Sequence, residues 1–267
     1  MEQLKLLSIE PWWVHCVGLF QDGSVRKIYL SPSVQNYCYT FEIGEDLGWR
    51  NVKSLSSSRS HLVGLTDDGR VQVESGSSYC FKGVEAWHNA ISISAGYEST
   101  AGILGDGTLI YSYNGGVDSL QCDRKDVKAI TLCARTVYGV DGAGTLFRSE
   151  GGLTKILAND CDKIIKLGVL GETVYGLTTG GDVKVLYGND YDMENWSCIV
   201  KIASSNDHLL GLTNNGKVLW KGKDSEQIKA LNPDSKIVDI FAGCYHSLAM
   251  NESGFLFSPK NYWLRYW

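Results

Sequence analysis

Residues 238–257 read VDIFAGCYHSLAMNESGFLF, and six other segments of the chain repeat the spacing of their key residues. We take His246 as the zero position of its segment. Ile240 lies six positions before it, and Gly254 lies eight positions after it. The zero positions of the other copies are His15, His61, Ser99, Thr136, Thr173 and His208. All copies keep the glycine, as Gly23, Gly69, Gly107, Gly144, Gly181, Gly216 and Gly254. A spacing that is kept along the whole chain indicates a repeat architecture.

Within each copy the apolar residues alternate with other residues, which is the period of a β-strand and not of a helix. Residues 62–66 and 209–213 show this alternation, each with a glycine in the middle. A glycine inside a strand predicts that another backbone lies close by. Asp68-Gly69 and Asn215-Gly216 follow these segments, and such pairs are typical of a β-hairpin turn. We therefore predict an all-β protein built from short antiparallel strands.

The repeats fill the chain like a closed circle. Consecutive zero positions are 35 to 46 residues apart, which is room for three to four short strands. The 14 residues before His15 and the 21 after His246 together make one further repeat length. Radial repetition of small sheets is the arrangement of a β-propeller. We predict one domain over residues 1–267, a seven-bladed β-propeller.

The copy that starts at His15 is the longest, because extra residues fall within positions 28–47. This stretch contains Tyr37, Tyr39 and Phe41. An insertion in a repeat maps to a surface loop or an added hairpin. We expect either a longer blade hairpin without further role or a wedge that contacts a partner.

The composition excludes several classes of protein. The net charge is −5 and no basic stripe occurs, so the chain is not expected to bind nucleic acid by itself. The eight cysteines are scattered without the paired spacing of a zinc site, and they suit a reducing compartment. The first residues lack the apolar core of a signal peptide, and no window has the length of a membrane span. We expect a monomeric protein of the cytoplasm or nucleus.

The repeat resembles that of the regulator of chromosome condensation family. The best matches are IVDIFAGCYHSLAMNESGFLF and IVKIASSNDHLLGLTNNGKVLWKG. The resemblance spans the chain and implies a propeller, although only Trp220 keeps the aromatic residue near the end of the family's motif. Propellers of this family include a nucleotide exchange factor, a photoreceptor and ubiquitin-ligase modules. The resemblance therefore implies a fold and no single function.

The histidines at the zero positions are expected to be structural. Other copies carry serine or threonine there, so the side chain performs one local task in every repeat, such as a hydrogen bond to backbone. Trp49, Trp87 and Trp196 each lie twelve positions before zero, and we expect them to cover a blade edge. No nucleophile, base and orienting group can be assembled from the sequence. We predict no enzyme activity, no cofactor and no metal.

The two residues before each zero position vary freely, and they fall on a loop at one rim of the ring. Aromatic residues and arginines mixed with acids are typical of a protein-binding surface. The predicted partner-binding residues are Trp12, Trp13, Arg59, Tyr97, Arg135, Glu172 and Tyr245, with Tyr37, Tyr39 and Phe41 beside them. We predict a scaffold that binds a protein partner. The alternatives are guanine-nucleotide exchange on a small GTPase and lectin-like glycan binding through rim tryptophans.

Overall fold

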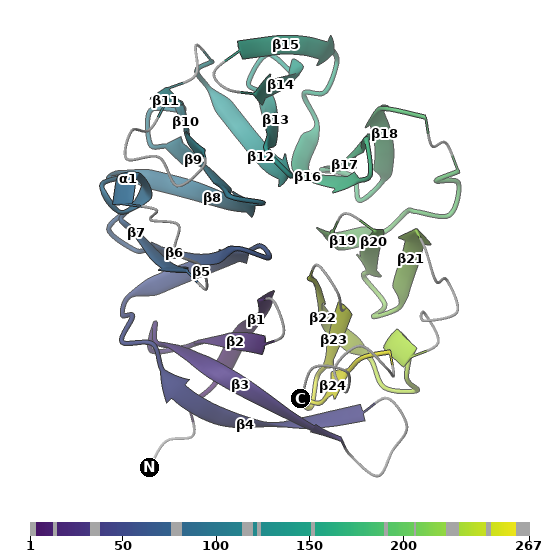
Figure 1. The fold of residues 1–267 in the computed structure, drawn as a ribbon. Coiled ribbons are helices and arrows are strands. Elements are labelled where there is room, and N and C mark those ends of the chain that lie inside the picture. Colours follow the sequence, from purple (N-terminus) through teal and green to yellow (C-terminus); the bar gives the residue numbers. More distant parts are fainter. Residues whose placement is uncertain are drawn as a thin grey trace.

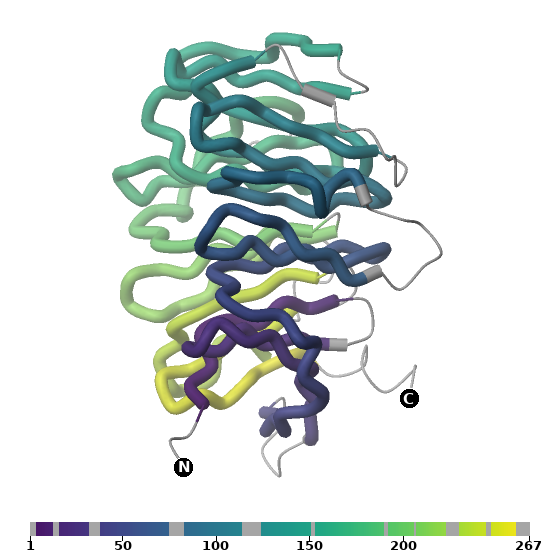
Figure 2. Tube along the Cα trace, turned by 90° about the vertical axis from the view of Figure 1, so that its left-hand side faces the viewer, coloured from purple at the N-terminus to yellow at the C-terminus, as the bar shows by residue number. Residues whose placement is uncertain are grey.

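The chain folds into a ring of small antiparallel β-sheets (Figure 1). The structure, a computed structural model, describes residues 4–12, 15–32, 38–75, 82–113, 120–121, 124–150, 153–189, 192–205, 207–222, 230–243 and 247–259. These residues form 24 strands and one short helix, α1 (Lys82–Glu85). Viewed from the side, the strands cross the thickness of the ring (Figure 2). Each turn between strands therefore lies at one of its two faces.

Five of the sheets each contain one repeat, with the first strand on the inside of the ring (Figure 1). The three-stranded sheets are β5 (Val52–Ser57), β6 (His61–Thr66) and β7 (Val71–Ser75); β16 (Ile164–Leu170), β17 (Thr173–Thr178) and β18 (Val183–Tyr187); and β19 (Ile199–Ser204), β20 (His208–Thr213) and β21 (Val218–Gly222). The four-stranded sheets are β8 (Ala90–Gly96), β9 (Ser99–Leu104), β10 (Leu109–Tyr113) and β11 (Leu120–Gln121); and β12 (Val127–Cys133), β13 (Thr136–Asp141), β14 (Leu146–Glu150) and β15 (Leu153–Ala158).

A seven-stranded sheet joins the first repeat to the last. It contains β1 (Leu6–Trp12), β2 (His15–Phe20), β3 (Val25–Pro32), β4 (Cys38–Asp46), β24 (Leu256–Phe257), β23 (Ser247–Asn251) and β22 (Ile237–Ala242), in that spatial order. Strand β4 pairs with β3 on one side and with β24 on the other, where Tyr39 lies opposite Leu256. The insertion thus supplies a strand that ties the two ends of the repeat array together.

This finding corrects the expectation that Tyr39 contacts a partner as part of a wedge. Tyr39 is 7% exposed and packs in one hydrophobic cluster with Ile9 of β1 and Leu256 of β24. Phe41 packs against the same cluster. Tyr37 lies outside the described residues. An aromatic side chain at the junction of two repeats buries its apolar area there and is not presented to a partner.

The repeated glycine of the hairpin turn fits each sheet to the next. Gly69 has φ +78°, and its carbonyl accepts a hydrogen bond of 2.9 Å from the backbone N–H of Ala90, where the next repeat begins. A Cβ atom on Gly69 would lie 2.9 Å from Asn89 Cα. Both the positive φ and the close approach favour glycine here. The positive φ recurs in all seven copies and explains why each keeps the glycine, whereas at Gly254 no atom lies within 4 Å of an added Cβ.

The glycine in the middle of the second strand has a different cause from the one predicted. The sequence predicted a close backbone, but a side chain fills the space instead: a tryptophan ring in three repeats, and leucine, isoleucine or phenylalanine side chains at Gly18, Gly139 and Gly176. A Cβ on Gly64 would meet the ring of Trp49 at 2.7 Å, and one on Gly211 would meet Trp196 at 2.7 Å. The tryptophans twelve positions before zero therefore lie flat over glycines inside the sheets, and they do not cap an edge.

Hydrophobic clusters fill the spaces between neighbouring sheets. One cluster joins Tyr111 of β10 to Ile130 of β12 and Phe147 of β14. The aliphatic residue six positions before zero is fully buried in two of the repeats, as Ile9 and Ile240. Burial of apolar area between sheets stabilises the ring because each sheet alone exposes its faces.

Each first strand carries a bulge at the same place. The register shifts between the ninth and the seventh position before zero in all copies, for example between Ile164 and Lys166 and between Ile237 and Asp239. A bulge bends a strand and changes the direction of the side chains beside it.

No helix within the described residues is long and apolar enough to cross a membrane.

Candidate functional site

The loop between the first and second strand of each repeat forms one rim of the ring, as predicted from the antiparallel order. Among the described rim residues, Arg59 and Glu172 are exposed, and Tyr97 is 45% exposed. These residues belong to three different sheets, in the loops β5–β6, β8–β9 and β16–β17. Trp13 and Tyr245 lie outside the described residues.

Arg135 is held in place by the neighbouring repeat. Its Nη2 atom is 2.9 Å from Glu98 Oε2, and its Nη1 donates a hydrogen bond of 2.8 Å to the hydroxyl of Tyr113. The guanidinium group lies 5.0 Å from the centre of the Tyr113 ring, a cation–π contact. The hydroxyl of Tyr111 donates to the backbone carbonyl of Arg135 at 2.7 Å. The rim beside Tyr97 is therefore an ordered polar surface.

Trp12 does not belong to this surface. Its side chain is 8% exposed and packs with Val17, Trp49 and Leu62 in the cluster between the first two repeats. Its indole Nε1 has no hydrogen-bond partner within the described part of the chain. Trp12 is the last residue of β1, so sequence position alone placed it near the rim, whereas the strand directs its side chain between the sheets.

The zero-position histidines link neighbouring repeats. His61 Nε2 is 2.7 Å from Thr100 Oγ1 on the next sheet, and His208 Nε2 is 2.6 Å from Ser247 Oγ. Burial lowers the pKa of His61 to about 3 and that of His208 to about 4, so both rings are neutral at pH 7. The prediction of a shared structural task fits this geometry. The two histidines contact hydroxyl groups, whereas Ser99 at the same position of its repeat donates a hydrogen bond of 2.9 Å to the backbone carbonyl of Ala134 in the next repeat.

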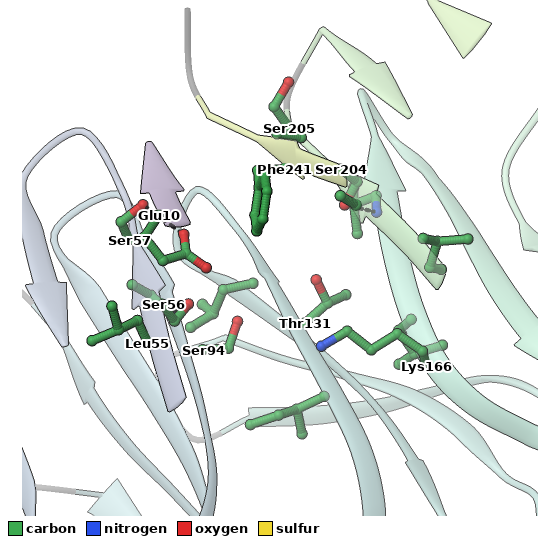
Figure 3. Close-up of a pocket in the computed structure, with 18 of the residues that line it drawn as sticks. Glu10, Leu55, Ser56, Ser57, Ser94, Thr131, Lys166, Ser204, Ser205 and Phe241 are labelled. Carbon is green, nitrogen blue, oxygen red and sulfur yellow. Dashed lines mark hydrogen bonds between the residues drawn. The ribbon is translucent and has the colours of Figure 1, made fainter. Parts of the chain in front are cut away.

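A cavity of about 220 Å³ lies in the middle of the ring, and the first strand of each repeat contributes to its wall (Figure 3). Its polar lining includes Glu10, Ser57, Ser94, Thr131, Lys166 and Lys201. Glu10 and Lys166 come from β1 and β16, which lie on opposite sides of the ring (Figure 1). The cavity therefore brings polar side chains from opposite sides of the ring together, and we call it the channel.

Glu10 is the acidic residue of this channel. Its Oε2 atom is 3.0 Å from the hydroxyl oxygen of Ser57, which is also 2.8 Å from the carbonyl oxygen of Pro11. Burial raises the pKa of Glu10 to about 7, although the Ser57 hydroxyl and the ammonium groups of Lys201 and Lys166 favour the charged form. The single hydroxyl proton of Ser57 cannot serve both acceptors fully, which favours a proton on Glu10.

The two lysines of the channel have different surroundings. Lys201 forms an ion pair with Asp239, and its ammonium group lies 4.7 Å from the centre of the Phe241 ring. Within the described residues, Lys166 has neither an ion pair nor a hydrogen bond, and water in the channel reaches its side chain. Desolvation by the surrounding protein lowers the pKa of Lys166, whereas the negative charge of Glu10 across the channel raises it.

Sequence reasoning missed the channel. Many of its polar residues lie five or seven positions before zero, on either side of the aliphatic core position: Glu10, Ser56, Ser94 and Thr131 at the fifth, and Lys166 and Lys201 at the seventh. The alternation of a strand places these residues on the opposite face from the core. That alternation was a usable signal.

The described residues contain no group of three or more His, Cys, Asp or Glu side chains that could hold a metal ion.

The fold is that of known β-propellers. No protein-family model and no curated protein matches the chain. Among solved structures, it is similar to human WBSCR16, with a TM-score of 0.69 and 14% identity over 97% of this chain and 87% of that one. It is also similar to the CRINKLY WD40 ectodomain of ACR4 from Arabidopsis thaliana, with a TM-score of 0.64 and 13% identity over 95% of each chain.

A third similar structure is the Cps50 (Swd1) β-propeller domain of Myceliophteria thermophila. Its TM-score is 0.59 at 13% identity, over 97% of this chain and 96% of that domain. The β-propeller fold predicted from the repeat is thereby confirmed. Likeness at such low identity shows the fold alone, and it does not assign the chain to the regulator of chromosome condensation family.

Proposed function

We propose that the chain is a single-domain, seven-bladed propeller of repeats like those of the regulator of chromosome condensation, and that it binds a protein partner without catalysing a reaction. Seven sequence copies, each with the same bulge and the same glycine turn, support the blade count. Strand β4 accounts for the smaller number of separate sheets, because it fuses the first and last repeats into one.

The rim carries the binding proposal. Tyr97 exposes a large aromatic ring next to an arginine that Glu98 and Tyr113 hold in place, and Arg59 and Glu172 lie in loops of other blades. Tyrosine and arginine are enriched among residues that dominate binding energy at protein interfaces. An arginine that is already ordered loses little entropy on binding. This combination of an exposed aromatic and an ordered charge is the observation that supports the proposal.

The absence of catalysis is also a proposal. The buried histidines hydrogen-bond to the neighbouring repeat in the same way, so they act as links in a symmetric structure. A catalytic group needs an environment that differs from its counterparts. Nucleotide exchange on a GTPase and glycan binding remain the competing functions, since both also need only a surface.

The experiment is an affinity purification with the parent protein, a rim variant and a control variant, and mass spectrometry identifies the partner. The affinity of each form for the recovered partner is then measured. The double variant Tyr97→Ala/Arg59→Ala should weaken binding at least tenfold. Phe255→Ala is the matched control, because Phe255 is 43% exposed in the turn between β23 and β24, at the opposite end of the strands from the rim loops. Equal binding by the rim variant and the parent would refute the rim proposal. Recovery of a GTPase or a glycoprotein bound through its glycan would favour an alternative.

A further inference from the structure

The channel contains hydrogen-bond donors that lack protein acceptors. Ser94 on β8, Thr131 on β12 and Lys166 on β16 belong to three successive first strands, and all three line the cavity. Across the described residues, none of these three side chains has a hydrogen-bond partner in the protein. Figure 3 shows the amino group of Lys166 extending into the cavity, on the opposite side from Glu10.

Other hydroxyl groups at the cavity wall are used differently. Ser56 Oγ accepts a hydrogen bond of 3.0 Å from the N–H of Ala95, and Ser204 Oγ accepts one of 3.1 Å from the N–H of Val169. Each acts as an acceptor for the neighbouring strand, so its own proton is still available to the cavity. The channel thus offers mainly donors, and its free ammonium group adds a positive charge.

The charge balance of the channel depends on Glu10. Lys201 and Asp239 neutralise each other as an ion pair. With Glu10 ionised, Lys166 is balanced across the channel; with Glu10 protonated, the channel carries one net positive charge. Cys16 on β2, also close to Glu10, keeps its proton because burial raises the pKa of its thiol. When Glu10 takes up a proton, the positive charge of the Lys166 ammonium group is therefore no longer balanced across the channel, and a bound anion would balance it.

We propose that the channel binds a small oxyanion, a carboxylate or phosphate group, through the Lys166 ammonium and the hydroxyl groups of Thr131 and Ser94. A volume of about 220 Å³ admits a small metabolite but no protein segment of any length. Hydrogen bonds from an ammonium group to an oxyanion are charge-assisted, and they are stronger than those between neutral groups. The site lies inside the ring and does not depend on the rim proposal.

Glu10 couples this binding to protons. The protonated carboxyl group adds a donor and removes a negative charge that would repel the anion. Binding is therefore stronger at pH 6 than at pH 8.5. Glu10→Gln, which resembles the protonated form, keeps the binding at both pH values.

The test measures the thermal midpoint of the intact protein in increasing inorganic phosphate or acetate, with sodium chloride at equal ionic strength as the reference. The parent protein at pH 6 should show a midpoint that rises with the logarithm of the anion concentration above Kd, by roughly 5 °C at 100 times Kd. The two anions distinguish a phosphate site from a carboxylate site. Lys166→Gln should weaken the effect at least tenfold, whereas Lys184→Gln, which removes an exposed lysine of β18, should keep it.

The midpoints of both variants without ligand show whether each one folds. A parent protein that responds to phosphate and acetate no more than to chloride would overturn the proposal. So would a folded Lys166→Gln variant with the parent's response, because the anion would then bind elsewhere. A Glu10→Gln variant that keeps the parent's pH dependence would remove the proton coupling.

Discussion

At the scale of single residues, the zero-position histidines show how a repeat can use an ionisable group as a neutral link. His61 contacts Ser58 and Ser60 through Nδ1, at 3.2 and 2.9 Å, and Thr100 through Nε2. Protonation would place a charge at a site with no carboxylate among these contacts. Ser99 at the same position also reaches the next repeat, since its hydroxyl donates a hydrogen bond of 2.9 Å to the carbonyl of Ala134, so a serine can link neighbouring repeats as the histidine does.

This burial predicts a loss of stability in mild acid. The folded pKa of His61, about 3, lies below the value of about 6.5 in an unfolded chain, so the unfolded state takes up more protons between these values. The contribution of the neutral His61 ring to the free energy of unfolding is complete above pH 6.5. Below that pH it decreases by about 1.4 kcal/mol per pH unit. Glu10 opposes this trend between pH 7 and 4.5, because its raised pKa favours the folded state as it takes up a proton.

Urea unfolding at pH 7.5, 6.0 and 5.0 provides the measurement. The parent should lose stability as the pH falls, because His61 and His208 together outweigh Glu10. His61→Gln should reduce the pH slope by about 1.4 kcal/mol per unit, whatever its effect at pH 7.5. An unchanged slope in this variant would show that His61 is already protonated in the folded protein.

At the scale of elements, β4 is the strand that distinguishes the first repeat from the others. Its pairing with β24 joins residues more than 200 positions apart in the sequence. Such a pairing closes the ring through main-chain hydrogen bonds and through the side chain of Tyr39, which packs against both ends of the array. A ring closed in this way has no free edge strand at the junction.

Truncation at this junction should be costly. Tyr39→Ala removes a buried aromatic side chain and should lower the free energy of unfolding by about 3–5 kcal/mol. Tyr29→Ala on the paired strand β3 is the control, since Tyr29 is 39% exposed and its loss should cost about 0.5 kcal/mol or less. Denaturant unfolding of both variants compares them directly. Similar losses in the two would mean that β4 is an appendage and does not close the ring.

The repeat made most of these elements predictable, and the insertion was the exception. The pair Asp68-Gly69 predicted a turn, because the conformation of a turn depends on its own residues. The partner of Tyr39 was not predictable, because no other copy contains the inserted strand and no local pattern encodes a pairing with Leu256. Trp12 was misplaced for a related reason: its position in the chain is near the rim, but the direction of its side chain depends on the neighbouring repeat.

At the scale of the whole molecule, the ring separates three environments. The spaces between sheets are apolar, the rim is polar and exposed, and the channel in the middle of the ring has polar side chains on opposite walls. Lys166 and Glu10 lie 156 positions apart in the sequence, and only the closed ring brings them to one cavity. The alternation within each copy places these residues on the face away from the core, but their variation between repeats did not indicate that they share one cavity.

This separation predicts that stability and binding respond to different substitutions. Ile240 is fully buried and packs with Leu212, Val218 and Ala249 between the last two repeats. Ile240→Ala should cost about 2–5 kcal/mol of folding stability, because it leaves a cavity between two sheets. Tyr97→Ala at the rim should change stability by no more than about 0.5 kcal/mol, since it removes no core contact.

Urea unfolding of the two variants at pH 7.5 makes the comparison, and the slope of each transition shows whether the ring still unfolds as one unit. For Ile240→Ala we expect a lower midpoint and the parent's slope. The lost packing lowers the free energy of unfolding, but the ring is closed by β4 and still unfolds as one unit. A reduced slope would mean that the last repeats detach first. If Tyr97→Ala proves as destabilising as Ile240→Ala, the ring of Tyr97 belongs to the packing between blades, and the rim would lose its main candidate for partner contact.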